Sequence, residues 1–139
     1  MVYEEKKHAK SSWISRSSRG REKKTPWGHE YSWAGFDGMH GKSLYIKKGC
    51  RTSLKFHQVK SEMLFIRKGR VEVYYGNELS LNDSVGNAFK TSVLEIGDSL
   101  MVQSGSPYRL KALEDSEIIE IGNNLSDKPI RIEDDYGRI

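Results

Sequence analysis

The chain has 139 residues and a mass of 15.9 kDa, the usual size of one domain, which argues against separate cofactor and substrate domains. Apolar residues make up 36% of it, aromatic residues 10% and charged residues 30%, so it can build a compact interior and global disorder is excluded. The formal net charge is +4. A net positive charge can indicate a nucleic-acid partner, but this depends on where the charge lies along the chain.

The excess positive charge lies at the N-terminal end. Residues 1–24 contain eight Lys or Arg and three Glu, a net charge of +5, so the other 115 residues carry a net charge of −1. The globular part is therefore not basic, and no nucleic-acid partner is expected. The Ser-rich stretch 11–24 is typical of a solvated tail. Alternatively it is a docking arm, because Trp13 and Ile14 are apolar anchors within it.

The sequence has no feature of a membrane or secreted protein. No apolar run approaches the roughly 18 residues needed to span a bilayer, and the first residues lack the apolar core of a secretory signal. The single cysteine, Cys50, cannot form an internal disulfide and has no metal-spaced partners for a zinc site. We expect a soluble, cytoplasmic protein with no membrane partner.

From Thr25 onward, short β-type segments alternate with glycines, and no segment has helical apolar periodicity. About nine short strands predict a sandwich or a barrel. The expected strands are Glu30–Trp33, Lys42–Lys47, Thr52–His57, Glu62–Arg67, Arg70–Tyr75, Ser92–Ile96, Leu100–Gln103, Tyr108–Leu113 and Glu117–Ile121.

Two runs of residues have a recognisable spacing. The first contains Gly49, Lys55, His57, Glu62 and Gly69, and the second contains Gly97, Gln103, Gly105 and Tyr108. These spacings resemble the two cupin motifs, and the segments Thr25–Tyr31 and Ile130–Arg138 resemble the two ends of cupins related to type II mannose-6-phosphate isomerase. That family also forms the C-terminal domain of mannose-1-phosphate guanylyltransferases. The resemblance implies an all-β cupin, a double-stranded β-helix or jelly-roll barrel, over residues 25–139, preceded by the basic arm 1–24.

The resemblance also implies a metal site in the mouth of the barrel. The isomerase branch has Gln, His, Glu and His at its four ligand positions, which correspond here to Lys55, His57, Glu62 and Tyr108. Strand alternation independently places Lys55 and His57 on one face. A lysine ammonium has no lone pair for a metal, and Tyr108 must first lose a proton with a pKa near 10. No cofactor is therefore expected, and a divalent metal, if bound, would use His57 and Glu62.

Sugar-phosphate isomerisation passes through an enediolate whose negative charge needs a cation. Lys55 is predicted to supply that cation or to hold the phosphate, with His57 or Glu62 as the base. The predicted catalytic residues are thus Lys55, His57 and Glu62, and the predicted substrate-binding residues are Lys55, Tyr108 and Arg109. The structural alternative is a buried ion pair between Lys55 and Glu62 that replaces the metal, with His57 as a hydrogen-bonded pocket residue.

Three functions stay open from the sequence. They are an isomerase-like enzyme acting on a sugar phosphate or nucleotide sugar, a non-catalytic cupin that binds a carbohydrate or anion, and an assembly protein that docks through its arm. If Lys55 and Glu62 face the pocket, an apolar outer surface is expected at Leu54, Phe56, Met63 and Phe65. We expect a homodimer, with this surface covered by a second copy or by the arm with Trp13, Ile14 and Trp27.

Overall fold

A computed structural model describes residues 3–6, 9–18, 20–82, 86–124 and 126–139 of the chain. Every regular element in these ranges is a β-strand, so the all-β prediction is confirmed. The strands are β1 (Glu22–Thr25), β2 (Gly28–Phe36), β3 (Met39–Ile46), β4 (Leu54–Phe56), β5 (Glu62–Lys68), β6 (Val71–Tyr75), β7 (Lys90–Leu94), β8 (Ser99–Val102), β9 (Tyr108–Ala112), β10 (Ser116–Asn123) and β11 (Ile130–Glu133). None of the described residues belongs to a helix long and apolar enough to cross a membrane.

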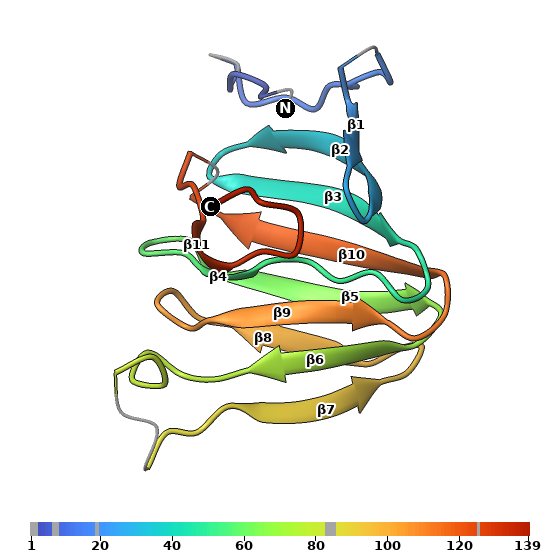
Figure 1. The fold of residues 1–139 in the computed structure, drawn as a ribbon. Helices are drawn as coiled ribbons and strands as arrows, with labels where there is room; N and C mark the ends of the chain where they lie inside the picture. The colour runs from blue at the N-terminus through green and yellow to red at the C-terminus, as the bar shows by residue number, and fades with distance from the viewer. Residues whose placement is uncertain (1–2, 7–8, 19, 83–85, 125) are drawn as a thin grey trace.

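The strands form two antiparallel sheets (Figure 1). One sheet has the order β1-β2-β3-β10-β5-β8 and the other has the order β11-β4-β9-β6-β7. All nine expected strands are present, with ends shifted by a few residues. β1 and β11 were not expected, and β1 crosses the boundary predicted between the arm and the cupin domain.

The core lies between the sheets and gives way to charged residues at one end. On β5, the inward side chains of Ile66 and Leu64 are fully buried, and the next inward position is Glu62. On β10, buried Ile118 is followed at the next inward position by Glu120. Apolar burial therefore stabilises one end of the barrel, while the other end holds carboxylates that need partners.

The described part of the N-terminal segment contacts the hairpin between β2 and β3. The backbone N–H of Glu4 donates to the carbonyl oxygen of Gly35 at 2.6 Å, and the Trp13 and Phe36 rings pack edge to face with centroids 5.4 Å apart. Residues 1, 2, 7, 8 and 19 of the predicted arm lie outside the described residues. Ile14 is exposed, whereas Trp27 belongs to the core, so the prediction that Trp27 covers an outer surface is wrong.

The expected apolar outer surface is only partly present. Met63 and Phe65 on β5 are 39% and 40% exposed, and they are joined by exposed Met101 on β8 and Ile121 on β10. Leu54, however, is buried at 3% exposure, so its assignment to that surface is wrong. β11 pairs with β4, and Glu133 lies opposite Leu54 in that pairing.

Candidate functional site

Three side chains form a row across β11, β4 and β9. Arg131 lies opposite Lys55, and Lys55 lies opposite Tyr108. Opposite residues of antiparallel strands point to the same face of a sheet, and here all three line one cavity. The Lys55 Nζ atom lies 4.8 Å from the centroid of the Tyr108 ring.

The cavity has a volume of about 700 Å³ and a strongly basic lining. Its nine basic residues are Arg21, Lys23, Lys24, Lys42, Lys55, Lys60, Lys128, Arg131 and Arg138. Its three acidic residues are Glu30, Glu120 and Asp127. His57 lines the cavity as well, so three of the four residues at the implied ligand positions face it directly.

The fourth, Glu62, lies beneath the cavity in a buried ionic network. The Tyr108 hydroxyl donates a short hydrogen bond to Glu62 Oε1. The Lys60 Nζ atom lies 3.3 Å from Glu62 Oε2 and 3.2 Å from Glu120 Oε2. Lys42 lies 3.8 Å from Glu120 and 3.3 Å from Glu30. The ammonium within ion-pair distance of Glu62 is thus that of Lys60, not that of Lys55 as the structural alternative supposed.

The two carboxylates of this network differ in acidity. Burial alone would raise the pKa of Glu120, but Lys42 and Lys60 outweigh burial and lower that pKa to about 2. Burial and the charge of Glu120 raise the pKa of Glu62, against the opposing effect of Lys60. Glu120 is therefore ionised at neutral pH, and Lys42 and Lys60 both lie within 4 Å of it.

Lys55 lies outside this set of ion pairs. Among the described residues no carboxylate oxygen lies within 4 Å of its Nζ atom, and burial lowers the pKa of Lys55 to about 8 although Glu62 and Glu120 oppose the change. The charge of Lys55 thus costs the folded state free energy at neutral pH. Charged groups that lack a close partner and have a perturbed pKa are concentrated at ligand-binding and catalytic sites.

Replacing Lys55 is expected to stabilise the protein. Lys55→Met should raise the free energy of unfolding at pH 7 by about 1–2 kcal/mol, since the wild-type charge is disfavoured in the fold. The pKa of Lys55 is about 8 in the folded protein and 10.5 in the unfolded chain. The extra free energy of unfolding of Lys55→Met over wild type should therefore disappear as the pH rises from 8 to 10.5. Urea unfolding across this range tests it, with exposed Lys111→Met as the control. A less stable Lys55→Met protein at pH 7 would contradict the expectation.

His57 is held beside the cavity by the loop after β4. It is 6% exposed, and its Nδ1 atom is 3.7 Å from Asp127 Oδ2, too far for a hydrogen bond. That carboxylate oxygen instead accepts the backbone N–H groups of Val59 and Lys60 at 2.9 Å. Burial, together with the charges of Lys60 and Lys55, lowers the pKa of His57 to about 4. The imidazole is therefore neutral at pH 7 and can accept a hydrogen bond or a proton.

The residues at the four implied ligand positions do not fit a divalent metal. Within the described part of the chain, no three His, Cys, Asp or Glu side chains are grouped as metal ligands would be. The Lys60 ammonium lies against the carboxylates of both Glu62 and Glu120, and the Lys55 side chain projects into the cavity beside them. A metal ion bound to Glu62 or Glu120 would have to replace the Lys60 ammonium that already pairs with both carboxylates.

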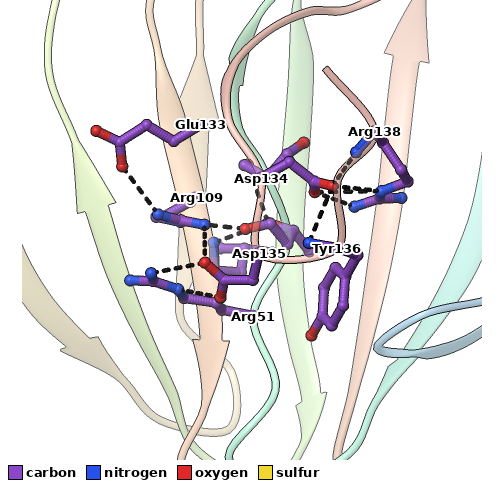
Figure 2. Close-up of polar contacts among 10 residues, drawn as sticks. Arg51, Arg109, Glu133, Asp134, Asp135, Tyr136 and Arg138 are labelled. Atoms are coloured by element: carbon purple, nitrogen blue, oxygen red, sulfur yellow. Dashed lines mark hydrogen bonds and ion pairs between the residues drawn. The ribbon is translucent and has the colours of Figure 1, made fainter.

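Arg109, predicted to bind substrate, points away from the cavity, and that placement corrects the prediction. Strand alternation sends Tyr108 and Leu110 inward and Arg109 outward. Its Nε donates to the carbonyl oxygen of Thr52 at 3.1 Å. Its Nη1 donates to Glu133 at 3.3 Å (Figure 2). Arg109 instead anchors the C-terminal segment to the outer face of β9.

The C-terminal segment, residues 134–139, is fastened by further ion pairs (Figure 2). Arg51 donates two hydrogen bonds to Asp135, at 2.5 and 2.8 Å. Within the segment itself, Arg138 binds Asp134, with its Nη2 atom 2.7 Å from Oδ1, and this hydrogen bonding lowers the pKa of Asp134 to about 2. The pairs of Arg51 with Asp135 and of Arg109 with Glu133 tie this end of the chain to the barrel beside β11, the strand that carries Arg131.

Sequence reasoning missed Lys42, Lys60, Glu120 and Arg131. Lys60 is in a loop, where no periodicity indicates direction, and β11 was not expected as a strand. On β10 both faces carry isoleucines, since Ile118 points inward while Ile119 and Ile121 lie on the other face. Alternation therefore did not reveal which face holds Glu120.

Comparison with known proteins supports the fold. No family model matches the chain, and no curated protein matches it. Among solved structures, it is similar to KdgF from Halomonas sp., with a TM-score of 0.58 and 16% identity over 68% of this chain and 76% of that one. It is also similar to a variant oxalate decarboxylase from Bacillus subtilis, with a TM-score of 0.62 and 15% identity over 76% of this chain.

A third similar structure is the vicilin from Solanum melongena, in which different anionic ligands occupy structurally similar pockets. Its TM-score is 0.58, with 16% identity over 68% of this chain. The chain spans 27% of the oxalate decarboxylase chain and 26% of the vicilin chain. These similarities confirm the predicted cupin fold; resemblance to the mannose-6-phosphate isomerase branch in particular stays a prediction.

Proposed function

We propose that this chain binds an anionic carbohydrate, such as a sugar phosphate, in its barrel cavity without a metal ion. The observation that carries the proposal is the pair of Arg131 and Lys55. They are directly opposite in adjacent strands and face the same cavity, and within the described residues neither has an ion-pair partner within 4 Å. Like charges directly opposite in a sheet destabilise it. An anion in the cavity would offset that repulsion.

The remaining lining suits a polar ligand with one anionic group. The Nε atom of Arg131 is buried without a hydrogen-bond partner, and a guanidinium is suited to paired hydrogen bonds with phosphate or carboxylate oxygens. Exposed Lys23, Lys24 and Lys128 also line the cavity and would attract an anion toward it. The neutral imidazole of His57 is available to hydroxyl groups. Anionic ligands in the vicilin pockets are consistent with this use of the fold.

Calorimetric titration tests the proposal. A hexose phosphate should bind the full chain, while the neutral hexose binds at least tenfold more weakly. Arg131→Gln should lower the affinity for the phosphate about ten- to a hundredfold, the usual effect of losing a charge-assisted hydrogen bond. Exposed Arg67→Gln, which removes a surface ion pair with Glu117, is the matched control and should leave the affinity unchanged. Equal binding of both sugars, or unchanged binding by Arg131→Gln, would overturn the proposal.

Isomerisation of a sugar phosphate is the second candidate, as the resemblance implied. The observation in its favour is the neutral, cavity-facing imidazole of His57, which can act as a base at pH 7. Lys55 would then face the developing enediolate. Nuclear magnetic resonance in heavy water tests it, because a base of this kind exchanges the proton next to the sugar carbonyl for deuterium. Absence of exchange with a bound sugar phosphate would leave binding as the function.

The homodimer is a separate proposal. Exposed Met63, Phe65, Met101 and Ile121 lie together on the outer face of the six-stranded sheet and would be covered by a second copy. Light scattering of the full chain tests the dimer, and a monomer would refute it. Deletion of residues 1–18, which spares β1, tests whether the N-terminal segment contributes.

A further inference from the structure

We propose that Lys55 is a covalent attachment point, forming an imine with the carbonyl group of an anionic sugar or related aldehyde bound in the cavity. The inference deepens the proposed function and rests on it, since it assigns the carbonyl end of the same ligand to Lys55 and its anionic end to Arg131.

The placement of Lys55 separates it from Lys42 and Lys60, the other two lysines of the cavity lining that are at least half-buried. Lys42 and Lys60 each lie within 4 Å of two carboxylate groups. Lys55 lies instead over the face of the Tyr108 ring, 4.8 Å from its centroid, and projects into the 700 Å³ cavity. It is therefore the cavity-lining interior lysine, among the described residues, whose amine is not committed to a carboxylate.

The surroundings also favour the amine form of this side chain. Burial and the neighbouring charges of Lys42 and Lys60 lower its pKa to about 8, with Glu62 and Glu120 opposing. A lysine that is desolvated near other cations is activated as a nucleophile. The free amine is then present in a useful fraction close to neutral pH.

The reaction is a simple condensation. The lone pair of the Lys55 Nζ atom attacks the carbonyl carbon, and a C–N bond forms. The carbonyl oxygen then leaves as water with the two hydrogen atoms of the neutral amine, which gives a C=N bond without any oxidant or reductant. Opposite Lys55 across the strand pair, Arg131 is placed to hold the anionic group during this step.

Reductive trapping tests the inference on the full chain. Glyceraldehyde 3-phosphate is added with cyanoborohydride, which delivers hydride to an imine carbon and makes the C–N bond permanent. Intact mass and peptide mapping then locate the label. One label at Lys55 is expected, at a rate at least tenfold above that of any other lysine. A hexitol phosphate, which has no carbonyl group, should suppress the label by competition.

Two variants make the result specific. Lys55→Arg keeps a positive charge but cannot form the imine, so it should lose the fast label, whereas exposed Lys111→Arg should keep it. Circular dichroism establishes that both variants are folded. Label spread evenly over the lysines, or an undiminished fast label in Lys55→Arg, would overturn the inference.

Calorimetry with the hexitol phosphate separates this inference from the function on which it rests. Binding of the hexitol phosphate without labelling at Lys55 would overturn the imine and support anion binding. If the hexitol phosphate does not bind and Lys55 is not labelled, both the imine and the anion site are overturned. Labelling at Lys55 without hexitol phosphate binding would support the reactive amine and overturn the anion site.

Discussion

Lys60→Met should destabilise the protein by about 3–5 kcal/mol, the usual cost of removing one partner of a buried ion pair. The Lys60 ammonium lies between Glu62 and Glu120, at 3.3 and 3.2 Å, and all three side chains are buried. Without it, the two carboxylates lie close together, and among the described lysines and arginines Lys42 alone remains within 4 Å of Glu120. Urea unfolding at pH 7, followed by circular dichroism, measures the loss.

A second substitution identifies the cause. Lys60→Met combined with Glu62→Gln should recover at least half of the lost stability, because the amide is neutral and its oxygen still accepts the hydrogen bond from Tyr108. Lys68→Met, on the exposed part of β5, should change the free energy of unfolding by less than about 0.5 kcal/mol. A loss below about 1 kcal/mol in Lys60→Met would show that the network is not essential to the fold.

Acid should destabilise the protein through His57 well before its surface carboxylates are protonated. In the fold the pKa of His57 is about 4, while its ordinary value is 6.5. Between these values the unfolded chain binds a proton that the folded chain rejects, so stability is lost as the pH falls from 6.5 to 4. The loss from this residue amounts to about 3 kcal/mol. Burial also lowers the pKa of His40, which adds a loss of the same sign.

Comparison with His57→Gln isolates this contribution. The raised pKa of Glu62 acts in the opposite direction, because that group gains a proton in the fold as the pH falls, so the wild-type profile alone does not identify His57. The free energy of unfolding is measured in urea at pH 7, 6, 5 and 4.5. As the pH falls, the value for wild type should decrease steadily relative to the value for His57→Gln. His29→Gln, at a half-buried histidine on β2, serves as the control. Parallel profiles for wild type and His57→Gln would contradict the assignment.

The strands and the all-β class were predictable from residue order, because glycine turns and short β-type segments are local signals. The cupin fold in particular was implied by the resemblance of the two motif spacings. The spacing of Lys55, His57, Glu62 and Tyr108 was also readable, and the structure brings these residues to one end of the barrel. Strand alternation would have excluded Arg109, next to Tyr108, from that end.

The partners of these residues depended on contacts between segments distant in the chain. Glu62 pairs with Lys60 in preference to Lys55 because a loop, whose direction no period indicates, brings Lys60 between two strands. Arg131 reaches Lys55 only because β11 returns to β4 from the far end of the sequence. Leu54, which alternation alone marks as outward, is buried in the strand that pairs with β11, with Glu133 opposite it. Alternation determines which side of a strand a residue takes, but the neighbours on that side are set by strand pairing and loop placement, which local sequence does not encode.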